Sequence, residues 1–496
     1  MHGKKRLAGA AALAIGAACL LSPAALAEET PRYQQEEFVI STFHGVPSMP
    51  NGFYNEVMFA LKEVGMTHLE TAFTSPEGSE MALQIAEELG LKVIVQDTNL
   101  YGGFQNQTIP PTTEEDILKV IEKYAQYESF GGYYVWDEPF LEQLDDVKKN
   151  MDWIQKHDPG KLRLVALLQS YSPTYWWPNG TFKEYIDTYV DKIDPDHLSF
   201  DYYVFDADVD NGTPLKDSYM WMDMAYIRKK ALERDIPYWY YLQILDDVAN
   251  PNINPQPMTR GRISFQVYTA MAYGATGIQY FNTMDSIVDD YGRRLDKFDI
   301  LKSINSEIHN LGPTLMELTS TVIYPTIDLA RHEYIGSLEE DATLVASAPG
   351  DMFFGEFKDD DGNDYLLPVN CDYDNPKAGT ITLKGRWDVY ELDAATGETK
   401  LKAADTDTIE IDYVEGGGAL YALRPVGADF PVLPGTGEPA APDNPSSDGP
   451  SSDTASNGET DNGLMTVLLI VGGIVAAGLV IIGVIMVVKL RRPVKK

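Results

Sequence analysis

The feature that most constrains the fold is a regular alternation of two patterns between residues 37 and 312. Short runs of apolar, β-branched and aromatic residues predict buried strands, and each is followed by an amphipathic stretch that predicts a helix. The predicted strands cover 38–43, 67–73, 92–96, 132–136, 162–168, 197–204, 237–244 and 277–281. The predicted helices cover 54–64, 79–89, 114–127, 142–156, 182–190, 219–234, 259–273 and 297–310.

Eight strand–helix units over about 275 residues are typical of a (β/α)8 barrel, or TIM barrel, so we predict an α/β fold with the barrel at 37–315. The alternative is an open, doubly wound sheet. That fold rarely needs eight such units, and it often carries a Gly-rich phosphate loop after its first strand, which this sequence lacks. A barrel places its active site at the carboxyl ends of its strands.

A second pattern follows the barrel. Helical periodicity disappears after residue 320, and strand-like runs at 351–357, 364–370, 379–384, 387–393 and 408–413 are separated by turn residues. This pattern predicts a β-sandwich domain at 320–425.

The two ends of the chain predict how it is located. Basic residues at 4–6 and an apolar run ending in Ala25-Leu26-Ala27 are typical of a secretory signal peptide, placed at 1–27. Residues 464–488 form an uncharged stretch long enough for a transmembrane helix, and the basic tail 489–496 indicates a cytoplasmic end. Residues 430–462, rich in Pro, Ser, Gly and Asp, predict a disordered stalk. We therefore expect a single-pass protein of the cell membrane with an extracellular ectodomain.

Charge and cysteine content limit the classes of partner and the kind of cell surface that fit this sequence. The chain has 39 Lys and Arg against 75 Asp and Glu, a net charge of −36, which repels nucleic acid. Of the 2 cysteines, only Cys371 remains after signal cleavage, so no internal disulfide is expected. A surface protein without disulfides suits a bacterium better than an animal cell surface.

Polar side chains stand at almost every predicted strand end. Any one of them could be a solvated loop residue or a helix cap, but the set together indicates a ligand site. These residues are His44, Glu70, Asp97, Asn99, Asp137, Glu138, Gln169, Asp201, Tyr203, Gln243, Gln279 and Asn282.

The end of the fourth strand carries the strongest motif, Trp136-Asp137-Glu138-Pro139. Proline ends the strand and holds the two carboxylates at its lip. Strict alternation predicts that Glu138 shares a face with Tyr134 and Trp136, with Asp137 opposite. A carboxyl group beside aromatic rings loses solvation, which raises its pKa and suits a general acid. The alternative is that the pair caps the next helix.

This motif resembles that of barrel glycoside hydrolases, in which a Glu at this place is the acid/base residue. The β-galactosidase-like clan of retaining enzymes carries Asn-Glu there, whereas barrel hexosaminidases with substrate-assisted chemistry carry Asp-Glu, as here. The stretches 200–203 and 262–281 and the domain after the barrel are also similar to those of bacterial glycosidases. The resemblance covers residues 37–425 and implies a glycosidase in which Glu138 is the proton donor.

One departure leaves the mechanism open. The β-galactosidase-like clan has its nucleophilic Glu at the end of the seventh strand, where this sequence has Leu242-Gln243. In one scheme Asp137 orients a substrate acetamide while Glu138 protonates the leaving oxygen. In a second, Asp201 is the nucleophile or base opposite Glu138. In a third, the site binds without catalysis. The separation of the carboxylates would decide between inverting and retaining geometry.

Further contacts to a sugar are expected from aromatic and polar side chains near the strand ends. Sugar rings present apolar C–H faces that stack on aromatic rings, although ordinary packing is the alternative for each. We predict substrate contacts for His44, Glu70, Asp97, Tyr203, Gln243, Trp176, Trp177 and Trp239. An acidic run before Asn211-Gly212 resembles a calcium loop with its glycine one place late, and the histidines are isolated. We expect no metal site and no cofactor.

Three functions are compatible with these features. The first is an extracellular, membrane-anchored glycoside hydrolase that cleaves O-glycosidic bonds of oligo- or polysaccharides, with Glu138, Asp137 and Asp201 as catalytic residues. The second is a non-catalytic carbohydrate receptor or inactive homologue on the same barrel. The third, an adhesin or scaffold, leaves the polar strand ends unexplained. The expected partners are a carbohydrate and, through one C-terminal helix, a membrane.

Overall fold

The computed structural model describes residues 30–100, 112–172, 180–209, 211–246, 257–284 and 286–435. The predicted signal peptide, transmembrane helix and tail, and nearly all of the predicted stalk, lie outside these ranges. Within them, no helix is both long and apolar enough to cross a bilayer.

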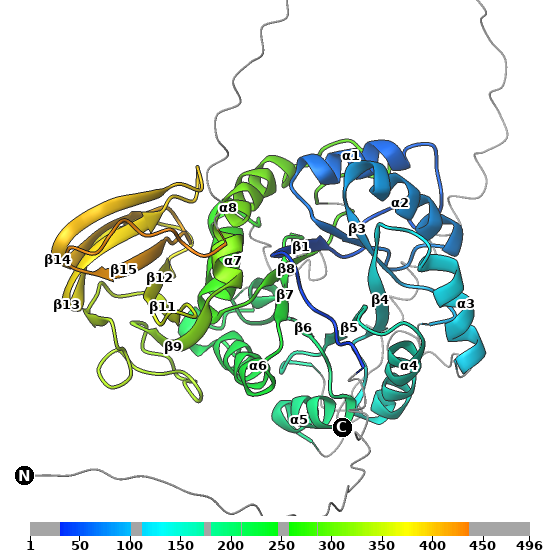
Figure 1. The fold of residues 1–496 in the computed structure, drawn as a ribbon, viewed down its shortest axis with the longest axis horizontal. Helices are drawn as coiled ribbons and strands as arrows, with labels where there is room; N and C mark the ends of the chain where they lie inside the picture. The colour runs from blue at the N-terminus through cyan, green and yellow to red at the C-terminus, as the bar shows by residue number, and fades with distance from the viewer. Residues whose placement is uncertain are drawn as a thin grey trace, which may run out of the picture. The chain divides into compact units, whose positions relative to one another are not determined.

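In the described part of the chain, eight parallel strands form a barrel (Figure 1). They are β1 (Val39–Thr42), β2 (His68–Glu70), β3 (Lys92–Val95), β4 (Phe130–Asp137), β5 (Leu162–Leu167), β6 (Leu198–Asp201), β7 (Tyr238–Gln243) and β8 (Gly277–Phe281). Ladder pairing runs in the order β1-β8-β7-β6-β5-β4-β3-β2. The ring closes where the Thr67 N–H donates to the Ile40 carbonyl (2.9 Å) and the Gly45 N–H donates to the Glu70 carbonyl (2.7 Å). The barrel prediction is confirmed, and the open sheet is excluded.

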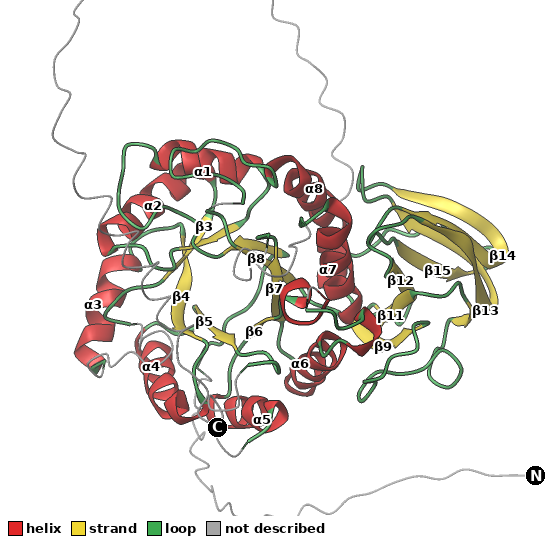
Figure 2. Cartoon of the chain, turned by 180° about the vertical axis from the view of Figure 1, so that it is seen from behind, coloured by secondary structure: helices red, strands yellow, loops and turns green. Residues whose placement is uncertain are grey.

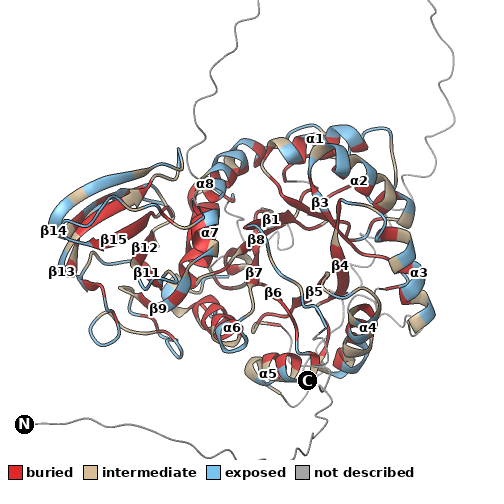
Figure 3. Cartoon of the chain, viewed as in Figure 1, coloured by how far each residue is buried: buried red, intermediate tan, exposed pale blue. Residues whose placement is uncertain are grey.

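The helices surround this barrel, seen from behind in Figure 2. They are α1 (Tyr54–Glu63), α2 (Pro76–Leu89), α3 (Glu114–Tyr124), α4 (Leu144–His157), α5 (Phe182–Ile193), α6 (Met220–Arg234), α7 (Arg260–Tyr273) and α8 (Phe298–Met316). Side-chain caps fix where some of the helices begin. Thr113 and Asp116 form a capping box at the start of α3, and Thr181 and Glu184 form one at the start of α5. In most of these helices the inward face is buried and the outward face exposed, as amphipathic periodicity predicts, whereas α7 is buried on all sides from Gly261 to Tyr273 (Figure 3).

Apolar and aromatic side chains fill much of the barrel interior, together with a few buried polar residues. Near the amino ends of the strands, Trp239 is fully buried, and any side chain at Gly277 would collide with its indole. The indole Nε1–H donates to the Gln35 Oε1 (2.9 Å). This end of the barrel is a packed floor, and barrel enzymes place their active sites at the opposite, carboxyl ends of the strands.

The second part of the described chain is an antiparallel sheet, which fits the predicted β-sandwich domain. Its strands are β9 (Thr319–Pro325), β10 (Val345–Ser347), β11 (Met352–Lys358), β12 (Asp364–Asn370), β13 (Lys377–Leu392), β14 (Thr399–Tyr413) and β15 (Leu420–Pro425). Two strands predicted separately, 379–384 and 387–393, are one strand, β13. Its ladder with β14 shifts register between Thr382 and Trp387, on either side of Gly385, whose φ of 100° suits glycine.

Barrel and sheet share a continuous apolar core and form one compact unit. The Phe353 ring of β11 stacks on Tyr273 of α7 (4.6 Å between centroids) and on Trp221 of α6 (5.3 Å). Two residues along β11, any side chain at Gly355 would collide with the carbonyl oxygen of Ala272. The sheet therefore covers the outside of α6 and α7 and leaves the carboxyl ends of the strands to form the site.

Candidate functional site

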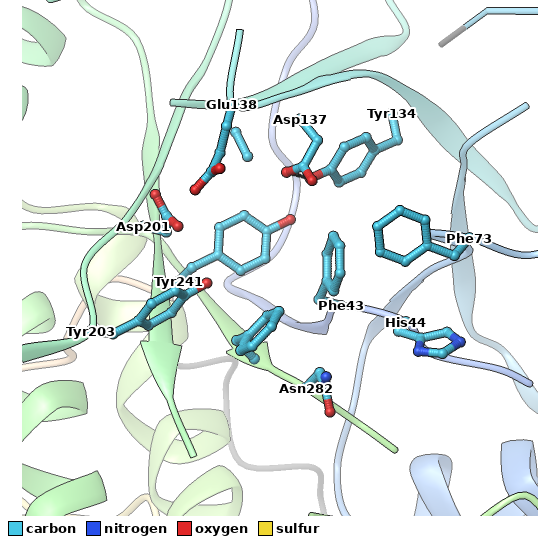
Figure 4. A pocket seen from close by; sticks show the side chains of 12 residues that line it. Phe43, His44, Phe73, Tyr134, Asp137, Glu138, Asp201, Tyr203, Tyr241 and Asn282 are labelled. Carbon is cyan, nitrogen blue, oxygen red and sulfur yellow. Dashed lines mark hydrogen bonds between the residues drawn. The ribbon is translucent and has the colours of Figure 1, made fainter. Parts of the chain in front are cut away.

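A cavity of about 270 Å³ lies at the carboxyl ends of the barrel strands (Figure 4). The residues that line it lie in, or directly after, strands β1, β2, β4, β5, β6, β7 and β8. They are Phe43, His44, Phe73, Tyr134, Asp137, Glu138, Ala166, Asp201, Tyr203, Tyr241, Phe281 and Asn282. The structure thus brings together six of the predicted strand-end residues: His44, Asp137, Glu138, Asp201, Tyr203 and Asn282.

A β-bulge in β4 decides which side chains face this cavity. Tyr134 pairs with Leu164 and Trp136 pairs with the next residue, Val165, so β4 has one residue more than β5 here. Val135 and Trp136 both join the core between barrel and helices, while Tyr134 belongs to the barrel interior. The bulge turns Asp137 to the same inward side as Tyr134. Glu138 also lines the cavity, because it lies just beyond the strand with a left-handed backbone (φ 46°) that ends the alternation. The prediction that Asp137 and Glu138 lie on opposite faces is therefore wrong.

Asp137 lies deep in the cavity and is 7% exposed. Its Oδ1 accepts a hydrogen bond from the Tyr134 hydroxyl (2.8 Å), which holds the carboxyl group against the barrel interior. Burial raises the pKa of Asp137, and the neighbouring charge of Glu138 raises it further. Asp137 thus favours its neutral form more strongly than an exposed aspartate does.

Glu138 and Asp201 form a carboxyl pair, with the two groups facing each other in Figure 4. The Glu138 N–H donates to the Ala166 carbonyl (3.0 Å), which fixes the residue just beyond β4. Asp201 ends β6, is 4% exposed, and is hydrogen-bonded to Glu138. Burial raises the pKa of Asp201, as do the charges of Glu138 and Asp137. A hydrogen bond between two carboxyl groups needs a proton on one of them, so this site holds a proton at pH values where exposed carboxylates have lost theirs.

Strained backbone is concentrated around the cavity. His44 (φ 51°), Phe73 (φ 58°) and Glu138 (φ 46°) all adopt the left-handed region, which non-glycine residues rarely occupy. Elsewhere in the described ranges the positive-φ residues other than glycine are mostly aspartates, which tolerate this region better. Such strain persists only where the surroundings impose it, and it is typical of ligand sites.

The walls of the cavity are largely aromatic. The Phe43 ring contacts Phe73, Phe281 and Tyr241 at centroid distances of 5.6, 5.5 and 6.2 Å. Tyr203 packs on Phe281 at 5.2 Å. The arrangement combines acidic groups with ring faces, which suits a ligand that has hydroxyl groups and apolar C–H faces.

Several predicted contacts lie outside the cavity. Glu70 is fully buried below it, where its carboxylate accepts from the hydroxyls of Ser41 and Tyr241 and from the Gln279 amide. Burial raises the pKa of Glu70. Because Tyr241 lines the cavity, Glu70 acts on the site by orienting that ring.

Asp97, Gln243 and Trp239 also have structural partners. Asp97 accepts from the Tyr124 hydroxyl (2.6 Å), and the Gln243 Oε1 accepts from the Asp206 N–H (3.1 Å). Trp239 shares an inward face with Tyr241 and Gln243, but it lies in the barrel floor, so its prediction as a sugar contact is corrected. Trp176 and Trp177 lie outside the described residues.

The cavity residues that the sequence did not single out as contacts are mainly aromatic: Phe43, Phe73, Tyr241 and Phe281. The sequence could have indicated Tyr241. It lies two residues after Trp239, so strand alternation puts both side chains on the same face, and Tyr241 is nearer the carboxyl end of β7. Phe43 and Phe73 follow their strands, where alternation no longer assigns a face.

Asp223 of α6 is a buried carboxyl group outside the cavity lining, behind the strand ends. It is 2% exposed, and its Oδ2 accepts from the Ser170 N–H (2.8 Å). Burial raises its pKa to about 8. An unfolded aspartate has a pKa near 3.9, so the stability linked to this group is fully present below about pH 4 and is lost as the pH rises through about 8.

Asp223→Asn should therefore flatten the pH dependence of stability. Asparagine keeps an oxygen that accepts from Ser170, but it does not titrate. We expect the drop in Tm between about pH 5 and about pH 9 to be smaller in the variant than in the parent, measured by circular dichroism. Asp235→Asn, at an exposed position, is the matched control. An unchanged drop in the Asp223 variant would contradict the expectation.

Comparison with known proteins supports the fold. No protein-family model matches the sequence, and neither does any curated protein. Among solved structures, a glycoside hydrolase of family 5 from Bacteroides vulgatus ATCC 8482 is similar with a TM-score of 0.53 and 13% identity, covering 81% of this chain and 92% of that one. A second structure, described as a glycoside hydrolase, has a TM-score of 0.51 and 12% identity, covering 81% and 96%. The chain thus has the barrel fold of structures that are glycoside hydrolases.

Proposed function

We propose that the protein is a glycoside hydrolase that cleaves O-glycosidic bonds of oligo- or polysaccharides, with Glu138 as the general acid. The observation that carries this proposal is the hydrogen-bonded pair of Glu138 and Asp201 beside Asp137, within an aromatic cavity at the catalytic end of the barrel. Glycosidases need one carboxyl group that keeps a proton and another that is ionised when positive charge develops on the sugar.

In the proposed reaction, Glu138 gives its proton to the glycosidic oxygen as the bond from that oxygen to the anomeric carbon breaks. Asp201, then ionised, stabilises the positive charge on the sugar ring. A water molecule adds to the anomeric carbon and returns a proton to the carboxyl pair. Glycosidases with two catalytic carboxylates hold them about 5–10 Å apart, so the bound sugar has to separate Glu138 from Asp201.

A carbohydrate receptor is the second candidate, and one observation favours it. The carboxyl end of β7 carries Tyr241 and Gln243 rather than a carboxylate, and the Gln243 side chain is engaged with Asp206. A retaining mechanism with its nucleophile on β7 is therefore not available to this chain. A receptor on the same cavity would bind sugars through the aromatic walls without cleaving them.

The test is a screen of the purified ectodomain. The probes are 4-nitrophenyl glycosides of glucose, galactose, mannose and N-acetylglucosamine, together with mixed oligosaccharides. Hydrolysis of at least one probe that is lost in Glu138→Gln supports the hydrolase. Tight binding by calorimetry, with no product from any probe, would move the assignment to the receptor.

We also propose that this site faces the outside of the cell, with the chain anchored by residues 464–488. The proposal rests on the signal-peptide pattern at 1–27 and the basic tail at 489–496. Protease added to intact cells should release the ectodomain by cutting within 430–462, detected by immunoblot with an antibody against the barrel. An ectodomain that resists until the cells are lysed would contradict this orientation.

A further inference from the structure

Phe73 occupies an unusual position on the rim of the cavity. It follows β2, lines the cavity, and is 49% exposed. We propose that its ring is the platform for the end of the bound sugar unit that lies farthest from the cleaved bond. This inference rests on the proposed function, and it adds a residue that determines which sugars are accepted.

The backbone at Phe73 is the first part of the argument. Its φ of 58° is a left-handed conformation that glycine adopts without cost and phenylalanine avoids. The conformation is held from outside, because the Phe73 N–H donates to the Gln96 side-chain oxygen (2.8 Å) and the Thr74 N–H donates to the Thr71 carbonyl (3.1 Å). The chain thus keeps a bulky aromatic side chain at a backbone conformation that glycine adopts without strain, which points to a role for the ring.

The placement of the ring is the second part. Its edge-on contacts with Phe43 (5.6 Å) and His44 (6.3 Å) fix its orientation at the cavity mouth. Figure 4 shows Phe73 and His44 on the side of the cavity away from Glu138 and Asp201. A sugar whose glycosidic oxygen lies at Glu138 therefore extends its opposite end toward Phe73. Half-exposed ring surface that continues a cavity wall can stack on the C–H face of that sugar.

Exposure alone would not support this role. Phe59 of α1 is 61% exposed, but it lies in regular helix and is not part of the cavity lining, so it is an ordinary surface residue. Phe73 differs in three respects: its backbone is strained, its ring is held in place by Phe43 and His44, and its ring is part of the cavity wall. Phe59 therefore serves as the matched control for the loss of an exposed phenyl group.

The kinetic test compares Phe73→Ala with the parent on a 4-nitrophenyl glycoside that the parent cleaves and on an oligosaccharide with the same glycone. Loss of the stacked ring should raise KM by about 3–10-fold on both substrates, with a smaller change in kcat. The rise in KM should be equal on the two substrates, because the platform touches the glycone that they share and not the leaving group. Phe73→Trp, which keeps an aromatic ring, should have a KM near that of the parent, and so should Phe59→Ala.

A stability measurement tests the strain directly. Phe73→Gly and Phe73→Ala both remove the ring, but only glycine removes the cost of the left-handed backbone. The glycine variant should therefore unfold about 1–2 °C above the alanine variant. The same order is expected for Asp235→Gly against Asp235→Ala, at another left-handed position remote from the cavity, and the reverse order for Phe59 in its helix.

The outcomes separate this inference from the proposed function. An unchanged KM in Phe73→Ala, while Glu138→Gln loses hydrolysis, would overturn the platform and leave the hydrolase standing. A rise in KM confined to the oligosaccharide would overturn the placement, since it would put Phe73 on the leaving-group side. Equal stability of the Phe73→Gly and Phe73→Ala variants would remove the strain argument. Full activity of Glu138→Gln would overturn the role of Glu138 as general acid, and the absence of product from any probe with the parent protein would overturn the proposed function.

Discussion

Glu138→Gln should lower the rate of glycoside hydrolysis by about 10²–10⁴-fold, the usual contribution of a general acid. Glutamine keeps the size of the side chain and much of its hydrogen bonding, including contact with Asp201, but it has no proton to give to the leaving oxygen. The fold should survive, because the backbone hydrogen bond from Glu138 to Ala166 is independent of the side chain. The measurement is kcat/KM on the probes that the parent cleaves.

The loss should depend on the leaving group. A 4-nitrophenolate departs with little protonation, so its glycosides should lose less activity than an oligosaccharide, whose alcohol must be protonated as it leaves. Glu142→Gln, the same substitution at an exposed position four residues along the chain, should keep full activity. A Glu138→Gln protein with parental activity, or one with equal losses on both kinds of substrate, would rule out general acid catalysis by this residue.

Asp201→Asn should be as damaging as Glu138→Gln, with a fall of about 10²–10⁴-fold on every substrate. The variant leaves the developing positive charge without its carboxylate, and it also removes the partner with which Glu138 shares a proton. The effect should not follow the leaving group, because Asp201 acts on the sugar ring. Asp235→Asn is the control for the substitution itself. An Asp201→Asn variant within a few-fold of the parent would remove Asp201 from the mechanism.

Asp137→Asn distinguishes the remaining schemes. Asp137 lies outside the Glu138–Asp201 pair and is held by the Tyr134 hydroxyl, so we expect a smaller loss than at Asp201 on unsubstituted sugars. A loss that reaches its full size only on N-acetylglucosaminides would assign Asp137 to orienting the acetamide. The comparison is kcat/KM on the glucoside and the N-acetylglucosaminide, and proton NMR of the first-formed anomer then reports retention or inversion.

Much of the architecture was predictable because it follows from local periodicity. Each predicted barrel strand and helix overlaps the observed one, since parallel barrel strands are short buried runs and the helices are amphipathic. The acidic part of the site was predictable for a related reason. Asp137, Glu138 and Asp201 end their strands, and a closed barrel brings those ends to one face whatever the loops do.

The rest depended on features that periodicity does not encode. The bulge at Val135 is invisible in the run Tyr134-Val135-Trp136, since both of its outward residues are apolar. Alternation gives the face of Trp239 but not its depth in the barrel, so the sequence alone does not distinguish a residue of the barrel floor from one at the rim. The positive φ of Phe73 arises from its contacts with Gln96 and its neighbours, and the sequence has no glycine or asparagine there to signal it.

The stack of Phe353 on Tyr273 and Trp221 has an evolutionary consequence. A gene that lost the sheet would leave these barrel aromatics facing water, as a patch prone to self-association. A recombination event that replaced the sheet would have to supply a ring at the place of Phe353 and a residue without a side chain at the place of Gly355. The two halves are therefore expected to be inherited as a pair, and shuffling between relatives should succeed only where it exchanges both together.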